Sequence, residues 1–211
     1  MNKPNYFNNR YVRILCLVLS LLNINACAPL IVASAASTFA VIADRRTTGT
    51  VVEDSAIELK AARALKNDAE IVKNSNVSIS SYNERVLLTG QAANERIKNK
   101  IVDTVKNVSK VRTIYNEIAV AQPESFRSSS YDTWLTTKVK ANLTSSTEVN
   151  PINIKVKTDS KTVYLMGLVT PTEGDKATEI TRQIGGVQKV VKLFEYIDPS
   201  DGSSNNQYAM N

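Results

Sequence analysis

Two stretches of the sequence, Val77–Gly90 and Ile154–Gly167, carry the same pattern of alternating apolar residues around a polar turn. They are VSISSYNERVLLTG and IKVKTDSKTVYLMG, and each residue of the first lies 77 positions before its counterpart in the second. Apolar residues that alternate with period two on both sides of a short polar turn predict a β-hairpin. Gly90 and Gly167 are predicted to end the second strand of each hairpin, where the chain bends away.

The repeat continues beyond the two hairpins, and it therefore defines a whole structural unit. Val108–Ile118 matches Val187–Ile197 at an offset of 79, so the second copy gains two residues in between. These stretches predict a last strand in each copy, at 111–120 and at 188–197.

Helices are predicted before and after each hairpin, with the opening helices at 54–67 and 132–144. The second helix of the first copy has an apolar stripe at spacings of four, four and three residues: Ile97, Ile101, Val105 and Val108. The second helix of the later copy starts with a capping box, Thr170-Pro171-Thr172-Glu173, and continues with a stripe at Ala177, Ile180 and Ile184. Gly185 and Gly186 are predicted to stop it.

Each unit is thus predicted to run helix–strand–strand–helix–strand over about 65 residues, a size at which a domain is only marginally stable alone. The two copies are therefore expected to pack against each other or against a membrane. The predicted segments are a signal peptide at 1–26, a lipidated tether at 27–50, a first domain at 51–121, a linker at 122–130, a second domain at 131–198 and a disordered Ser/Asn-rich tail at 199–211.

The N-terminus has the features of an export signal. Basic residues precede a nine-residue apolar run, Ile14–Leu22, which is too short to cross a bilayer as a helix. The tetrad Ile24-Asn25-Ala26-Cys27 resembles a bacterial lipobox, although Cys27 could also be incidental. The resemblance implies acylation of Cys27, and Ala28 after it implies sorting to the outer membrane. Buried acyl chains contribute about 0.8 kcal/mol per methylene, so such an anchor needs no membrane-spanning helix.

The stretch after Cys27 predicts a tether. Residues 28–43 are uncharged and rich in Ala, Ser, Val and Ile, but they are too few to span a membrane. The polar residues 44–49 follow. A tether near the membrane surface is predicted, with local packing onto the first domain as the alternative. Cys16 leaves with the signal, so no thiol remains for a disulfide and folding depends on core packing.

Charge and composition argue against nucleic-acid binding and against catalysis. The net charge is +6, but the signal removes three of the 26 basic residues and no acidic ones, leaving about +3. Nucleic-acid-binding modules usually carry a stronger basic patch. The chain has no histidine, no mature thiol and no Gly-rich phosphate loop. We therefore expect no enzymatic activity, no cofactor and no metal site.

The repeated strands ending Val-Leu-Leu-Thr-Gly90 and Val-Tyr-Leu-Met-Gly167 resemble the BON domain. Further matches are Asp132–Val139, Leu165–Thr170 and Tyr115–Ile118. Two such copies behind a lipobox resemble the dual-BON outer-membrane lipoproteins of the DolP family. The resemblance implies an α+β fold of two tandem BON domains, each with two helices on a three-stranded mixed sheet. It also implies binding of anionic phospholipid through the second domain's opening helix, division-site enrichment, a role in envelope integrity, and contact with the outer-membrane protein assembly machinery.

The opening helix of the second copy is the candidate lipid site. Its predicted core stripe is Leu135, Val139 and Leu143. Trp134, the only tryptophan, lies about 100° from Leu135 around the helix. Its face also carries Thr137, Lys138 and Ala141, and Tyr131 is a further predicted contact. An indole beside a lysine suits the membrane interface, where the ring lies at headgroup depth.

Other interpretations of these residues stay open. Trp134 could instead pack at the edge of the sheet, and Lys138 and Lys140 could be ordinary surface charges. Aligning Leu65 with Leu143 places Ala56 opposite Trp134, so only the second copy has the indole. Asp132 is predicted to cap the helix.

Two functions are therefore compared: an anionic-lipid-binding module, and a protein-interaction adaptor for the assembly machinery. Lipid binding by protein lacking Cys27 separates them.

Overall fold

The structure is a computed structural model that describes residues 44–123 and 129–198. The predicted signal, Cys27, most of the predicted tether and the C-terminal tail lie outside the described residues. The first domain contains, in order, α3 (Thr48–Lys66), α4 (Ala69–Asn74), β1 (Ser75–Tyr82), β2 (Arg85–Ala92), α5 (Glu95–Lys106) and β3 (Thr113–Val120). The second contains α6 (Ser129–Thr144), the 3-10 turn η2 (Pro151–Asn153), β4 (Ile154–Asp159), β5 (Thr162–Val169), α7 (Pro171–Arg182) and β6 (Lys189–Tyr196).

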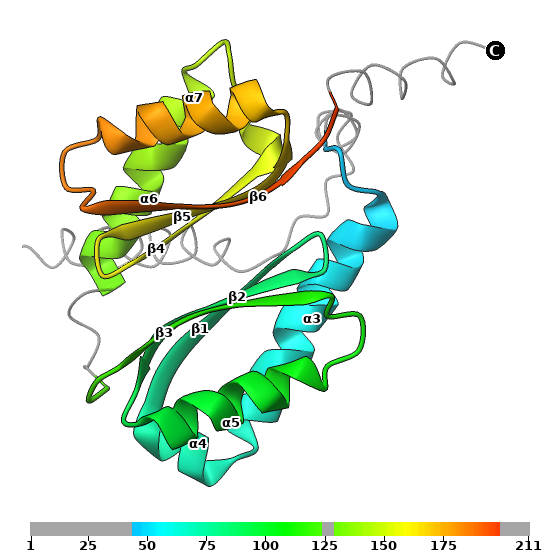
Figure 1. Ribbon diagram of the computed structural model, residues 1–211, viewed down its shortest axis with the longest axis vertical. Helices are drawn as coiled ribbons and strands as arrows, with labels where there is room; N and C mark the ends of the chain where they lie inside the picture. The colour runs from blue at the N-terminus through cyan, green and yellow to red at the C-terminus, as the bar shows by residue number, and fades with distance from the viewer. Residues whose placement is uncertain (1–43, 124–128, 199–211) are drawn as a thin grey trace, which may run out of the picture. The chain divides into compact units, whose positions relative to one another are not determined.

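Each domain has a three-stranded mixed sheet with helices over one face (Figure 1). The central strand, β2 or β5, pairs antiparallel with its hairpin partner and parallel with the last strand. The predicted α+β fold class and both hairpins are confirmed. The turns fall at Asn83-Glu84 and Ser160-Lys161, whose positive φ angles of 49–61° give the twist that two-residue hairpin loops require.

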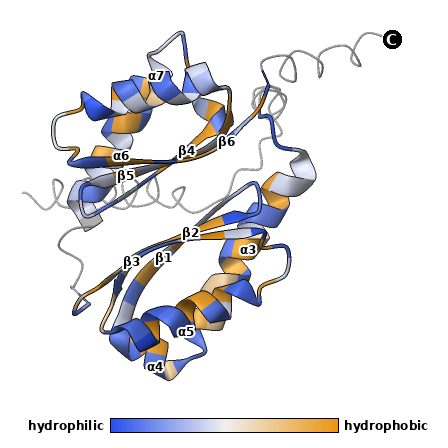
Figure 2. Cartoon of the chain, in the orientation of Figure 1, coloured by the Kyte–Doolittle hydropathy of each residue, from blue (hydrophilic) through white to orange (hydrophobic). Residues whose placement is uncertain are grey.

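The core of each domain lies between its helices and the inner face of its sheet. Helix α5 buries the predicted residues Ile97, Ile101 and Val105 against this face, and Figure 2 shows hydrophobic and hydrophilic bands along the helices. In the second domain the predicted capping box forms, with Thr170 and Glu173 bonded in both directions. The spacing of apolar residues in the sequence thus correctly predicted the buried face of α5, and the capping motif correctly predicted the start of α7.

The sheet faces that carry no helix form a third apolar cluster, and both domains contribute to it. Its buried members are Tyr82, Leu87, Tyr164, Met166 and Leu168. Residues 44–123 and 129–198 also fall within one compact unit of the chain. Domains this small gain stability by sharing a core, as their size predicted.

Gly90 and Gly167 are not strand ends, as the sequence had predicted, because both strands continue for two further residues. Their role is close backbone approach. A Cβ on Gly90 would lie 2.0 Å from the carbonyl oxygen of Asn76, and one on Gly167 would lie 2.5 Å from that of Asn153. Gly90 also has a φ of +114°, which L side chains rarely adopt.

Gly90→Ala is expected to lower the free energy of unfolding by about 2–3 kcal/mol, because the added methyl group meets backbone that cannot move away. Urea unfolding followed by circular dichroism measures the change. Gly185→Ala is the matched control, since a Cβ there has nothing within 4 Å. Equal stability of the two variants would contradict this role for Gly90.

The structure corrects several predicted boundaries. Helix α3 begins at Thr48 rather than 54, because the Thr47 side chain caps it by accepting from the Thr50 backbone N–H. At the end of the predicted tether, residues 44–46 are partly buried and 48–50 are helical. Arg46 packs on the first domain, which is the alternative that the sequence left open, whereas Arg45 contacts the second domain. Helix α6 begins at Ser129, inside the predicted linker, and helix α4 and turn η2 were not predicted. Short elements of this kind lack a periodic signal.

Candidate functional site

Helix α6 presents one buried and one exposed face. Leu135, Val139 and Leu143 are fully buried in the second domain's core, as their spacing predicted. Trp134 lies next to this stripe and keeps 50% of its surface exposed. The indole is therefore half embedded and half available to solvent.

Two of the predicted side chains, Tyr131 and Lys138, lie beside this indole. The Tyr131 ring lies 5.4 Å from the Trp134 ring, centroid to centroid, with 40° between their planes. The Lys138 ammonium lies 5.0 Å from the Trp134 ring centroid, within cation–π range. Tyr131 is itself 40% exposed. The result is a small surface of two aromatic rings and a cation, which we call the Trp134 face.

The other two predicted residues lie on α6 without joining this cluster. Thr137 is exposed, and its hydroxyl donates to the Thr133 carbonyl at 3.0 Å within the helix. Ala141 is exposed one turn after Lys138. Both leave the surface beside Lys138 uncrowded, because neither has a long side chain.

A second cation reaches the Trp134 face from the hairpin turn. The Lys161 ammonium lies 5.7 Å from the Tyr131 ring centroid. Sequence reasoning missed this residue, because it is 30 positions from Tyr131 along the chain. The internal repeat alone does not show that the hairpin turn packs against α6, so it could not have identified Lys161.

Asp132 holds that turn in place, and it does not cap the helix as predicted. It lies within α6, is buried, and accepts from the backbone N–H groups of Ser160 and Lys161 at 2.8 and 3.0 Å. A turn with positive φ angles presents two N–H groups in one direction, so a single carboxylate satisfies both.

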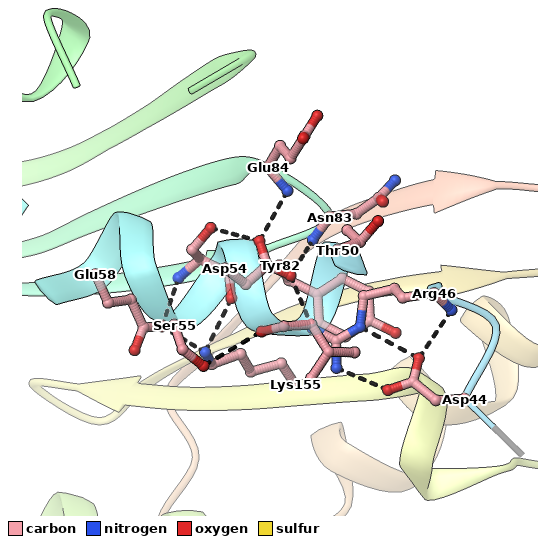
Figure 3. Close-up of polar contacts among 12 residues, drawn as sticks. Asp44, Arg46, Thr50, Asp54, Ser55, Glu58, Tyr82, Asn83, Glu84 and Lys155 are labelled. Carbon is pink, nitrogen blue, oxygen red and sulfur yellow. Dashed lines mark hydrogen bonds and ion pairs between the residues drawn. The ribbon is translucent and has the colours of Figure 1, made fainter. Parts of the chain in front are cut away.

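The first domain repeats this arrangement at Asp54, which lies 78 positions before Asp132 (Figure 3). Asp54 accepts from the N–H groups of Asn83 and Glu84, both at 2.8 Å, and from the Ser81 hydroxyl at 2.7 Å. It also pairs with Arg46 at 2.8 Å. The guanidinium of Arg46 lies 3.9 Å from the ring centroid of Tyr82, whose pKa burial raises to about 12.

The first domain lacks the Trp134 face. The offset of 78 places Ala56 where the second domain has Trp134, as the alignment predicted. Lys60 stands in the position of Lys138, but its ammonium binds the Glu53 carboxylate at 3.2 Å. The aromatic and cationic surface is therefore specific to the second domain.

Within residues 44–123 and 129–198 no group of acidic residues is arranged to hold a metal ion. In the same residues no helix combines the length and apolar character needed to cross a membrane.

Comparison with known proteins agrees with this architecture. The BON domain family matches residues 53–122 and residues 131–198. The protein therefore contains two BON domains. Outer membrane lipoprotein DolP of Haemophilus influenzae is 37% identical over 175 residues, which cover 83% of this chain and 91% of that protein.

Two further relatives match less closely. The 21 kDa hemolysin of Actinobacillus pleuropneumoniae is 33% identical, over 73% of this chain and 79% of that protein. Osmotically-inducible protein Y of Escherichia coli is 28% identical, over 67% of this chain and 72% of that protein. The chain belongs to the dual-BON DolP family.

Proposed function

We propose that this protein is an outer-membrane-anchored lipoprotein whose second BON domain binds anionic phospholipid through the Trp134 face of α6. Similarity to a relative named as an outer-membrane lipoprotein supports the outer-membrane location. Acylation of Cys27 provides the anchor, and the domains face the periplasm.

The observation that carries the proposal is the half-exposed indole between Tyr131 and Lys138. Tryptophan and tyrosine favour the membrane interface because one part of each ring system is apolar and another is polar. A lysine near an anionic surface contributes about 1 kcal/mol of attraction, and both Lys138 and Lys161 lie over these rings. The rings enter at headgroup depth while the ammonium groups meet the phosphates.

An anchored protein needs only weak contacts of this kind. The tether raises the effective concentration of lipid at the Trp134 face, so a modest intrinsic affinity suffices for stable engagement. Thr137 and Ala141 lie on the same exposed surface and allow the helix to approach the headgroups closely. From the family resemblance we further infer enrichment at the division site and a role in envelope integrity.

Co-sedimentation tests lipid binding without the anchor. The mature chain with Cys27→Ser is expected to pellet with vesicles that contain phosphatidylglycerol, and to stay in solution with vesicles of phosphatidylcholine alone. Added salt should weaken the binding, because exposed charges are screened. Equal pelleting with both vesicle types, or with neither, would contradict the proposal.

A second candidate function is a protein-interaction adaptor for the outer-membrane protein assembly machinery. It is favoured by apolar side chains exposed on the first domain, where Leu59 is 51% and Val72 57% exposed beside strand β1 at the edge of its sheet. Photo-crosslinking from position 59 in cells tests it. Crosslinks to assembly proteins would support the adaptor function. The crosslinking residue at position 59 should leave vesicle binding by the Cys27→Ser chain unchanged, because it lies on the first domain.

A further inference from the structure

Residues 44–46, which precede α3, contact both domains. Arg46 is held by the first domain, through its ion pair with buried Asp54 and its contact with the Tyr82 ring. Asp44 contributes from within the segment, accepting from Arg46 at 2.8 Å (Figure 3). These bonds fix the backbone immediately before the first helix.

Arg45, the neighbouring residue, reaches the second domain instead. Its guanidinium makes a two-pronged contact with the Glu173 carboxylate, at 2.6 and 3.1 Å, and donates to the Leu168 carbonyl at 3.0 Å. Its backbone N–H donates to the Asn153 side chain at 3.1 Å. Paired parallel bonds between guanidinium and carboxylate are among the strongest and most directional in proteins.

Glu173 is well placed to serve as this partner. It is residue N3 of α7, where its carboxylate already accepts from the Thr170 backbone N–H at 2.8 Å. Burial raises its pKa, but the hydrogen bonds from Arg45 and Thr170 outweigh burial and leave the pKa below its usual value. The group therefore stays charged at neutral pH and available to Arg45.

The contact with Arg45 lies at the opposite end of the second domain from the Trp134 face. Strand β5 begins at Thr162, beside the turn that Asp132 holds against the start of α6. Leu168 is six residues further along this strand, which corresponds to about 20 Å at the usual rise of a β-strand. The second domain thus holds Arg45 about one strand length from the turn that lies beside the Trp134 face.

We propose that Arg45 is a positioning residue for membrane attachment, which fixes the exit of the acylated segment on the second domain so that anchor and indole hold this domain at two separated points. This inference rests on the proposed lipid binding by the Trp134 face. The 17 residues between Cys27 and Arg45 span at most about 60 Å when extended, which is enough to cover the distance along the domain.

Without the Arg45 side chain, residues 44–46 would keep the Arg46 ion pair on the first domain, but only the backbone bond to Asn153 on the second. The second domain would keep its fold and its Trp134 face, but its own hold on these residues would be looser, so the anchor would define less sharply which of its surfaces meets the bilayer. The loss should therefore appear only when the protein is attached at Cys27. Free protein binds from solution in any orientation and does not depend on the exit point.

The test uses the mature chain coupled through the Cys27 thiol to a maleimide lipid, in vesicles of phosphatidylcholine and phosphatidylglycerol with brominated acyl chains. Bromine quenches an indole that enters the bilayer interface, and Trp134 is the only tryptophan in the chain. Coupled Arg45→Ala is expected to show severalfold less quenching than the coupled unaltered chain. Arg96→Ala is the matched control, since it removes an arginine from an exposed ion pair with Glu70 on the first domain.

Two additional arms separate the possible failures. Uncoupled chains with Cys27→Ser, with and without Arg45→Ala, should be quenched equally; absence of quenching in both would contradict the proposed lipid binding itself. Glu173→Gln keeps the bond to Thr170 but removes the charge, and it should reproduce the effect of Arg45→Ala without adding to it. Equal quenching of coupled Arg45→Ala and the coupled unaltered chain would overturn the positioning role.

Discussion

Trp134→Glu is expected to weaken binding of the Cys27→Ser chain to phosphatidylglycerol vesicles by about 100-fold. A tryptophan carries up to about 250 Å² of surface, and half of it is exposed here, so its burial contributes about 3 kcal/mol. That free energy corresponds to about two orders of magnitude in affinity. Co-sedimentation over a range of lipid concentrations measures the change.

The matched control for this substitution is Ala56→Glu, at the equivalent position of the first domain. It places the same carboxylate on the same side of a homologous helix, where no aromatic cluster exists, and it should leave lipid binding unchanged. Thermal unfolding of both variants should remain cooperative. Unchanged binding by Trp134→Glu, or loss of its fold, would show that the indole is a packing residue.

Asp54→Ala is expected to lower the free energy of unfolding by about 3–5 kcal/mol, the cost of removing one partner from a buried ion pair. The substitution leaves the N–H groups of Asn83 and Glu84 without their acceptor and removes one of the two carboxylates that pair with Arg46, the other being Asp44. Asp132→Ala removes only the two turn bonds of the second domain, so its expected cost is smaller, at about 1–3 kcal/mol.

Urea unfolding of the two alanine variants measures this difference between equivalent positions. Asp103→Ala, which removes a carboxylate from the exposed surface of α5, serves as the control and should change stability by less than about 0.5 kcal/mol. Equal losses for Asp54→Ala and Asp132→Ala would mean that the pairing with Arg46 adds nothing. If Asp54→Ala and Asp132→Ala lowered the free energy of unfolding by less than Asp103→Ala does, the role of both carboxylates in holding the hairpin turns would be contradicted.

Much of the fold could be predicted because it depends on local periodicity. Alternation in Val86 and Leu88 marks the inner face of β2, and the four-residue spacing of Leu135 and Val139 marks the buried face of α6. The internal repeat then strengthened each of these assignments, since two independent segments showed the same order of elements. The exposure of Trp134 also agrees with its predicted position beside the core stripe.

What could not be predicted depends on contacts between distant residues. Asp132 looked like a helix cap because aspartate favours that position, but a turn 28 residues later supplies its partners. Gly90 looked like a strand end, although the approach of Asn76 is what requires it. Arg45 looked like part of a polar tether, because its partner Glu173 is 128 positions away.

The central claim is that the Trp134 face enters an anionic membrane surface. Fluorescence of Trp134, recorded while phosphatidylglycerol vesicles are added to the Cys27→Ser chain, tests it most directly. A shift of the emission maximum to shorter wavelength that saturates with lipid, and that is absent with phosphatidylcholine, is the predicted result. An emission spectrum that stays constant while the protein pellets with the vesicles would place the lipid contact elsewhere and contradict the account.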